Sequence, residues 1–363
     1  MKVALVHEFL TQYGGAERVL EALLEIFPNA TIHTLVFDRQ KMGKYFGKYE
    51  IKTSWIQKMP LGVSKYKWYL PIMHKAIESF DFEKYDLVLS DASAFAKGVI
   101  TKKNTLHICY CHTPTRYLWN ETEFYLKTAP IPFFIRPVMP YVINNLKKWD
   151  YKAAQRPDFI IANSKTIQKR IKKYYDRDSV VIHPFVDVEK FCISKNIKNY
   201  YLIAGRMVPY KRYDIVIKAF NNLDKELKVV GSGYGLEDLK KITKSNKIEF
   251  LGRVSDKDLV KYYSECIAYV FPALEDFGIT PLEAMASGRP VIAYKAGGAT
   301  ETVVDGKTGS FFINQDENSL TKAIEKFNHK KFNPLEIRNH ALKFAKHGFK
   351  DKIKKFVNSK IKL

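Results

Sequence analysis

Two glutamates, Glu275 and Glu283, lie eight positions apart in the stretch EDFGITPLE. The Phe277-Gly278 pair predicts a flexible turn and Thr280-Pro281 the start of a helix, so the first glutamate lies in a loop and the second one turn into the helix. Carboxylates accept hydrogen bonds from hydroxyl groups, which nucleotide sugars carry in number. The spacing is unlike that of two carboxylates flanking a scissile bond, so the stretch favours ligand holding over hydrolysis.

Basic residues and glycines elsewhere are suited to phosphate. Arg206 and Lys211 stand five positions apart in GRMVPYKRYD, enough positive charge for a diphosphate, with surface salt bridges as the alternative. Gly14-Gly15 lies between an apolar run and a helical pattern. A phosphate can approach the backbone closely there, beside the positive end of the helix dipole, although a tight strand-to-helix turn would use the same glycines.

The elements that position these residues alternate along the chain. KVALVHEF, TIHTLVF, YDLVLSD, LHICYCH and DFIIANS predict strands separated by helices, and after the polar run 194–199 the pattern restarts at NYYLIAGRM. This alternation predicts an α/β protein with two Rossmann-like domains, each built on a parallel sheet. We expect an N-terminal domain at 1–190, a second domain at 191–345, and a C-terminal helix at 346–363 that packs back on the first domain.

In such sheets ligands bind outside the carboxyl ends of the strands, where loops expose backbone N–H groups. The predicted strands place Gly14-Gly15, Gly205-Arg206, Gly231–Gly233 and Glu275–Gly278 at edges of this kind. The phosphate and hydroxyl candidates are therefore expected at the ligand-binding ends of the two sheets.

The formal net charge of +22 favours phosphate-bearing partners, which leaves nucleic acid, anionic membranes and nucleotide substrates open. Between Lys41 and Lys75, eight lysines face one acid, Glu50, and are interleaved with aromatic residues. This composition suits an anionic membrane surface, and equally a solvated basic face over ordinary core residues. Without a long apolar window or a signal-peptide pattern, we expect a cytoplasmic protein, soluble or peripheral on the membrane.

The four cysteines do not form the pattern of a disulfide framework. The CYCH run, with Cys109, Cys111 and His112, has ligand-type residues but follows a strand-like segment and lacks a second C-x-x-C, which favours buried strand cysteines. The carboxylates between Asp86 and Asp91 lie at a strand and are interpreted as structural. No catalytic metal is expected.

The segment ALEDFGITPLEAMASGRPVIAYKAGG resembles the nucleotide-sugar site of family 4 glycosyltransferases. GGAERVL, YCHTPTRYLW, ANSKTIQKRI, AGRMVPYKRYD and LGRVSDKDL extend the resemblance over most of the chain, in the family's order. HTPTRYLW is similar to the bacterial mannosyltransferases that build O-antigen and similar lipid-linked glycans. The family has the GT-B fold and transfers sugar with retention of anomeric configuration. The resemblance therefore implies two Rossmann-like domains whose parallel sheets face each other across a cleft.

The resemblance implies roles for the residues that match the family's motif around the two glutamates. Glu275 matches the first glutamate of the E-x7-E motif, beside the donor sugar, and Glu283 the second, which binds the ribose hydroxyls. Backbone amides of Phe277, Gly278 and Ile279 would contact the sugar and phosphate.

Further roles follow from the other matching segments. Arg206 and Lys211 match the basic pair on the donor diphosphate, and the backbone near Val254 matches the base pocket. Gly15, with Gly14 in the same glycine loop, corresponds to the loop near the leaving phosphate. His112 corresponds to the residue near the hydroxymethyl group of the donor sugar. The cations would stabilise the departing diphosphate without metal or another cofactor.

Together these features predict a retaining hexosyltransferase, with mannose from GDP-mannose as the favoured donor. The acceptor would be a lipid-linked or other glycan in lipopolysaccharide, another cell-surface polysaccharide or glycolipid synthesis. The segments Lys41–Lys75 and Ile131–Trp149 would then dock the protein on the inner face of the membrane.

Two alternatives remain. A nucleotide-sugar epimerase would share the fold, although the glutamate motif and the basic pair disfavour it. A nucleic-acid-binding protein would explain the net charge but leaves the glycine loops and the glutamate pair without a role, so no specific nucleic-acid partner is expected.

Overall fold

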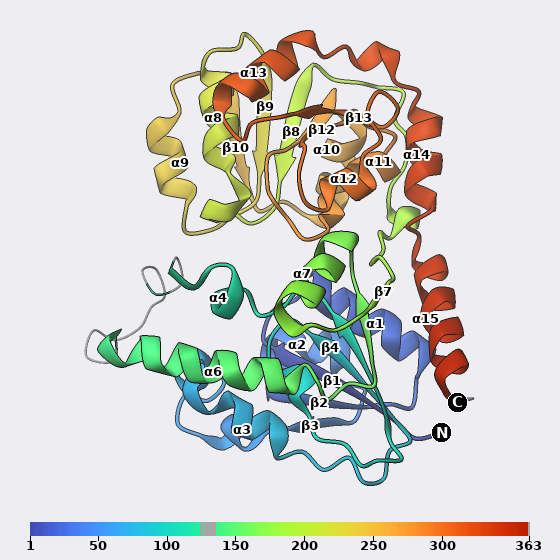
Figure 1. Cartoon of the computed structure of the whole chain (residues 1–363). Helices are drawn as coiled ribbons and strands as arrows, with labels where there is room; N and C mark the ends of the chain where they lie inside the picture. The colour runs from blue at the N-terminus through green and yellow to red at the C-terminus, as the bar shows by residue number, and fades with distance from the viewer. Residues whose placement is uncertain (124–125, 127–135, 362–363) are drawn as a thin grey trace. The chain divides into compact units, whose positions relative to one another are not determined.

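The computed structural model describes residues 1–123, 126 and 136–361 (Figure 1). The chain divides into two compact units. The N-terminal unit consists of Met1–His183 with Lys350–Leu363, and the C-terminal unit of Pro184–Phe349. The boundaries expected from the sequence lay after residues 190 and 345.

The elements of the N-terminal unit, in chain order, are β1 (Val3–Leu10), α1 (Gly15–Ile26), β2 (Thr31–Phe37), α2 (Arg39–Phe46), β3 (Ile51–Thr53), η1 (Trp55–Lys58), η2 (Tyr66–Ile72), α3 (Met73–Glu78), β4 (Leu87–Ala92), η3 (Ala96–Gly98), β5 (Leu106–Cys111), α4 (Arg116–Trp119), η4 (Arg136–Val138), α6 (Met139–Ala153), β6 (Phe159–Ala162), α7 (Lys165–Tyr175), β7 (Val180–Val181) and most of α15 (Lys346–Ile361).

The elements of the C-terminal unit are η5 (Val188–Lys190), β8 (Tyr200–Ala204), η6 (Pro209–Lys211), α8 (Tyr213–Asn221), β9 (Glu226–Val230), α9 (Leu236–Ile242), β10 (Ile248–Gly252), α10 (Asp256–Glu265), β11 (Ala268–Phe271), α11 (Ile279–Ala286), β12 (Val291–Tyr294), α12 (Ala299–Thr302), β13 (Gly309–Phe312), α13 (Glu317–Lys326), η7 (His329–Lys331) and α14 (Pro334–Leu342).

Each unit is built on one parallel sheet. The N-terminal sheet has seven strands in the order β3-β2-β1-β4-β5-β6-β7, and the C-terminal sheet six in the order β10-β9-β8-β11-β12-β13. The strand order reverses between β1 and β4 in the first sheet and between β8 and β11 in the second. Two Rossmann-like domains, as the alternating sequence pattern predicted, are therefore confirmed. The reversal points are where open sheets of this kind bind ligands.

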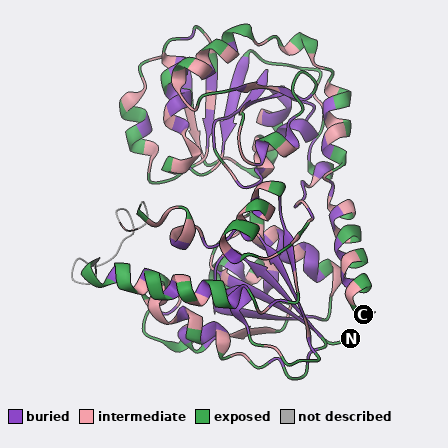
Figure 2. Ribbon diagram, in the orientation of Figure 1, coloured by how far each residue is buried: buried purple, intermediate pink, exposed green. Residues whose placement is uncertain are grey.

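Burial follows the parallel architecture. The strands at the centre of each sheet are buried, whereas the surrounding helices are exposed on their outer sides (Figure 2). In β1, seven of eight residues are buried, because helices cover both faces of a parallel sheet. Helix α1 buries Val19, Leu20, Leu23 and Leu24, four apolar residues at helical spacing.

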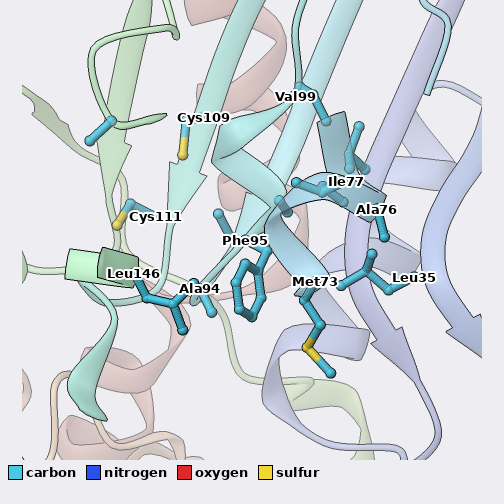
Figure 3. Close-up of a cluster of buried hydrophobic side chains, with 14 of the residues drawn as sticks. Leu35, Met73, Ala76, Ile77, Ala94, Phe95, Val99, Cys109, Cys111 and Leu146 are labelled. Carbon is cyan, nitrogen blue, oxygen red and sulfur yellow. The ribbon is translucent and has the colours of Figure 1, made fainter. Parts of the chain in front are cut away.

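The core of the N-terminal unit includes two of the cysteines. Cys109 and Cys111 are buried in β5, among Phe95, Leu146 and other apolar side chains (Figure 3). Both are free thiols. The interpretation of these residues as buried strand cysteines is confirmed.

Helix α15 packs against the N-terminal unit from Lys350 onward. The ring of Phe356 meets that of Phe159 edge to face, with 6.1 Å between centroids. Lys360 Nζ lies 4.4 Å from the centroid of the Phe159 ring, and Lys350 Nζ pairs with Glu25 Oε2 at 2.9 Å. Over the described residues, none of the helices has the length and apolar character needed to cross a membrane.

Two buried histidines make the stability of the N-terminal unit sensitive to acid. His33 is enclosed by the rings of Phe80, Phe82 and Tyr85. Burial, with the nearby charge of Lys52, lowers the pKa of His33 to about 4. Burial also lowers the pKa of His107, which is bonded to the Ser90 hydroxyl, to about 3.

Between pH 6.5 and about 4 the unfolded chain gains protons at these histidines and the folded chain does not. We therefore predict that the free energy of unfolding decreases as the pH is lowered through this range, by up to about 1.4 kcal/mol per pH unit for each histidine. His33→Phe should flatten this dependence in urea denaturation between pH 7 and 5. His347→Phe, at an exposed position of α15, should keep the wild-type slope. Equal slopes for the two variants would contradict the prediction.

Candidate active site

An ion pair crosses the reversal point of the C-terminal sheet. Lys211 lies in η6 after β8, and Glu275 in the loop after β11. Their Nζ and Oε1 atoms are 2.9 Å apart, and both side chains are mostly buried, with exposed fractions of 15% and 17%. The sheet thus brings together a predicted phosphate-binding cation and a predicted sugar-binding carboxylate.

The loop after β11 leads into a helix whose start is suited to an anion. Gly278 precedes α11 with φ +83°, and no described side chain caps the helix start. A Cβ at Gly278 would lie 2.8 Å from Phe271 Cζ, so the position excludes side chains by space as well as by backbone conformation. Phe277 is buried and Gly278 has no side chain, so the polar groups of these two residues are their backbone amides. Backbone N–H groups at the start of a helix, together with the helix dipole, favour a phosphate there.

A second glycine loop supports this turn from behind. The N–H of Gly298 donates to the carbonyl of Glu275 at 2.9 Å. A Cβ at Gly298 would lie 2.2 Å from both Cα and O of Phe277, so only glycine allows the two backbones to approach this closely. The position of the Glu275–Gly278 loop therefore depends on the glycine pair Gly297-Gly298.

The second glutamate occupies the place that the Thr280-Pro281 pattern indicated, one turn into α11. Glu283 is buried, and its Oε2 accepts a hydrogen bond of 3.0 Å from the hydroxyl of Tyr263. Burial, together with the charge of Glu283, raises the pKa of Tyr263 well above its ordinary value, so the phenol stays a donor. This bond fixes the Glu283 side chain within the unit.

Three further candidates of the C-terminal unit lie outside the Lys211–Glu275 ion pair. Arg206 follows β8, is exposed, and donates from Nη2 to the hydroxyl of Tyr210 at 3.3 Å. Val254 follows β10, which the strand order places two strands from β8. Ile279 is the first residue of α11 and is half-buried. Arg206 and Ile279 thus lie on the same loops as Lys211 and Glu275, whereas Val254 lies along the edge.

In the N-terminal unit, the candidates lie at the carboxyl ends of β1 and β5. Gly14 caps α1, Gly15 is its first residue, and Glu17 is the acidic residue of its first turn. His112 directly follows β5, with 15% of its side chain exposed. All four therefore belong to the end of the sheet where ligands bind.

A buried carboxylate connects His112 to β1. Asp91, the residue before the last of β4, lies within hydrogen-bonding distance of two imidazoles, with its carboxylate 2.8 Å from Nδ1 of His7 and 2.6 Å from Nε2 of His112. His7 Nε2 in turn lies 3.5 Å from Glu17 Oε1. The four residues form a line of alternating groups from the first turn of α1 to the end of β5.

Sequence reasoning missed most of this line. Asp91 was interpreted as structural, and its two bonds show that it contacts a candidate site residue. His7 and Glu8 lie within the apolar strand VALVHEFL, and polar residues in a strand buried on both faces were the available signal. Glu8 accepts hydrogen bonds from the backbone N–H groups of Ser93, Ala94 and Ala96, which fixes the loop after β4.

The TPTRYLW part of the motif after His112 is anchored by a second buried carboxylate. Asp150 of α6 accepts from the Thr115 hydroxyl at 2.7 Å, from Trp119 Nε1 at 2.8 Å and from the Tyr175 hydroxyl at 2.7 Å. Its charge is compensated by Lys97 Nζ at 2.5 Å. Thr115 and Trp119 therefore hold the segment that follows His112 against α6 and α7.

Residues 1–123, 126 and 136–361 contain no group of three or more histidine, cysteine or acidic side chains placed to hold a metal ion.

Comparison with protein families identifies both halves of the chain. Residues 13–190 match the model "Glycosyltransferase Family 4", and residues 194–348 match "Glycosyl transferases group 1". The two matches follow one another and together cover most of both units. The chain therefore belongs to the glycosyltransferases of these families, with the GT-B fold of two Rossmann-like domains.

Curated relatives have the same class of activity. An uncharacterized glycosyltransferase of Methanocaldococcus jannaschii is 27% identical over 89% of this chain and 87% of its own. An alpha-1,3/1,6-mannosyltransferase of Dictyostelium discoideum is 26% identical over 68% of each chain. A GDP-mannose-dependent alpha-(1-6)-phosphatidylinositol monomannoside mannosyltransferase of Mycolicibacterium smegmatis is 32% identical over 33% of this chain and 36% of its own.

A solved structure agrees on the fold. The sucrose-phosphate synthase of Thermosynechococcus elongatus has a TM-score of 0.76 over 99% of both chains, at 15% sequence identity. At this identity the likeness supports the GT-B fold, and the family matches indicate the hexosyltransferase class.

The close approach at Gly298 gives a stability prediction. Gly298→Ala should destabilise the protein by roughly 1–3 kcal/mol, because the new methyl group would overlap the Phe277 backbone. Gly348→Ala is the matched control, since a Cβ there meets nothing within 4 Å and replaces glycine in the helix α15. The control should be neutral or stabilise by up to about 1 kcal/mol. Urea denaturation measures both, and equal stabilities of the two variants would contradict the predicted packing.

Proposed function

We propose that the protein is a retaining mannosyltransferase that moves mannose from GDP-mannose to a lipid-linked or other glycan acceptor of the cell surface. The support for mannose is the set of mannosyltransferases among its relatives, one of which is named as GDP-mannose-dependent and acts on a lipid-linked sugar. Inner-membrane glycan assembly, including lipopolysaccharide synthesis, is the setting that this acceptor class implies.

The Lys211–Glu275 ion pair beside the start of α11 carries the proposal. A departing nucleoside diphosphate needs cations and backbone N–H groups that are already in place, and Lys211, Arg206 and the Phe277–Ile279 backbone supply them. Glu275 would accept hydrogen bonds from the sugar hydroxyls, and Glu283 from the ribose hydroxyls. The nucleotide base would lie near Val254, at the same edge of the C-terminal sheet. These cations and hydrogen-bond donors would act without a metal ion or another cofactor.

The residues of the N-terminal unit receive matching roles. Gly14 and Gly15, at the start of α1, would contact the leaving phosphate through their backbone N–H groups. His112 would contact the hydroxymethyl group of the donor sugar. The front-face mechanism, in which the leaving phosphate helps to take the acceptor proton, needs no protein nucleophile.

Product analysis tests the proposal. Incubation of GDP-mannose with the protein and a glycolipid extract should release GDP and give an α-linked mannoside, as retention of the donor configuration requires. Lys211→Ala should lower kcat/KM by about 10²-fold or more, because it removes a cation from the leaving diphosphate. The matched control is Lys240→Ala in α9, whose ion pair partner is Glu237 on the same helix.

A new nucleotide sugar formed without acceptor would indicate an epimerase and contradict the proposal. A β-linked product would contradict retention, and an equal effect of the two lysine variants would contradict the assigned diphosphate site.

We further propose that the N-terminal unit binds an anionic membrane surface through the segment 55–68. Trp55, Met59, Leu61 and Trp68 are exposed by 38–56%, which is unusual for large apolar side chains. Exposed lysines at 58, 65 and 67 lie between them, and Lys65 Nζ is 5.9 Å from the ring of Trp68. Aromatic side chains beside lysines suit an anionic interface. Of the second segment expected to dock, Ile131–Trp149, residues 131–135 lie outside the described residues.

Charge reversal at three positions tests this surface. Replacing Lys58, Lys65 and Lys67 with glutamate should lower binding to phosphatidylserine-containing vesicles, measured by sedimentation. The control carries the same charge change on the C-terminal unit, with Lys240, Lys241 and Lys244 replaced by glutamate. Equal losses in the two variants would show that only net charge matters and would contradict a defined docking surface.

A further inference from the structure

The line Glu17, His7, Asp91 and His112 is a buried set of ionisable groups, of which His112 alone has a role in the proposed function. His7 and Asp91 are partners in the register of the neighbouring parallel strands β1 and β4. The N–H of His112 donates to the carbonyl of Ala92, which extends the register of β4 and β5 by one residue. The sheet itself therefore places the three side chains next to one another.

The charges along this line alternate. Burial alone would lower the pKa of His7, but the bonds and charges of Asp91 and Glu17 raise it to about 10. Burial would likewise raise the pKa of Asp91, yet the two imidazoles hold it below its ordinary value. For His112, Asp91 outweighs burial and raises the pKa above its usual range. Two carboxylates and two imidazolium groups make the set electrically neutral, which is the condition for burying it.

An ionised Asp91 determines where the protons of His112 lie. A carboxylate only accepts hydrogen bonds, so the Nε2 atom of His112, 2.6 Å away, must carry a proton. The ring of Tyr110 also packs against the ring of His112, with 5.2 Å between the two centroids. Within the described part of the chain no residue bonds to Nδ1 of His112, and this nitrogen is the polar atom of the ring that remains for a ligand.

We propose that Asp91, compensated by His7, is a positioning residue that keeps His112 a charged hydrogen-bond donor at Nδ1, so that His112 binds an oxygen of the nucleotide sugar and does not remove the acceptor proton. This inference rests on the proposed function for its substrate. It assigns proton removal to a group other than His112, because an imidazolium has no lone pair to accept a proton.

Other charged groups around His112 agree with this state. His7 on β1 opposes its positive charge, whereas Glu8 on the same strand supports it, and Asp91 on β4 supports it most strongly. From the side of β6, Asn163 contributes a neutral amide that donates to the His112 carbonyl at 2.9 Å. Asp91 is therefore the group whose removal should change His112 most.

Histidine-selective ¹⁵N NMR of the full-length protein tests the proposal without any substrate. The signal of His112, assigned through its loss in His112→Gln, should show a proton on Nε2 and a pKa above the usual 6.5. Asp91→Asn should lower this pKa by about one unit or more, because the compensating charge is gone. His7→Gln should have the opposite effect and raise it, because it removes an opposing positive charge.

Ser90→Ala is the control, since it removes a buried bond to His107 from the same strand without touching the line. An Nδ1–H tautomer of neutral His112, or an unchanged pKa in Asp91→Asn, would overturn the proposal. If one variant fails to fold by circular dichroism, the other still decides, because their predicted shifts have opposite signs.

Kinetics connect the charge to the reaction. The kcat/KM of the wild type should fall as pH rises through the pKa of His112, and in Asp91→Asn the fall should begin at lower pH. Asp91→Glu, which restores a carboxylate, should move the pH at which kcat/KM falls back toward the wild-type value. If Asp91→Asn lowers kcat/KM but leaves unchanged the pH at which it falls, Asp91 only supports the fold, and the proposal is overturned. Failure of every nucleotide sugar to react, with the NMR shifts as predicted, would instead contradict the proposed function.

Discussion

One arrangement recurs in both units, an ion pair at the point where the order of the sheet reverses, formed between the two neighbouring strands or between the loops that follow them. In the N-terminal unit it is His7 with Asp91, and in the C-terminal unit Lys211 with Glu275. Taking charged groups out of water is costly, and an apolar pair would stabilise the sheets at least as well. Ion pairs at the two places where open sheets bind ligands therefore point to binding and chemistry, not to stability.

The two pairs differ in what surrounds them. Asp91 and His7 are buried within a set of groups whose charges cancel. The side chain of His112, which belongs to this set, is partly exposed. Lys211 and Glu275 remain partly exposed and lie beside backbone N–H groups at the start of a helix. In the proposed function, the C-terminal unit offers Lys211 and backbone N–H groups to a phosphate, while the N-terminal unit offers a hydrogen-bond donor at His112.

Much of this could be predicted from the sequence, because alternating strands and helices have strong local patterns. The two Rossmann-like domains and the position of Glu283 one turn into α11 follow from such patterns. The His7–Asp91 bond could not be predicted, because it depends on the register between strands 84 positions apart in the chain. An aspartate at a strand end is common, and only the neighbouring strand gives this one its two partners. The role of Gly298 is likewise a matter of close approach between two loops, which sequence spacing does not encode.

The central claim is that the reversal point of the C-terminal sheet holds a nucleotide sugar, and thermal stabilisation by ligands tests it most directly. We would compare GDP-, UDP- and ADP-linked sugars with an oligonucleotide, using the wild type, Lys211→Ala and Glu283→Ala, with Lys240→Ala as control. A ligand that binds only the folded state raises its melting temperature. The account predicts that GDP-mannose stabilises the wild type and the control, and neither site variant. Stabilisation by the oligonucleotide alone, with no effect of any nucleotide sugar, would contradict it.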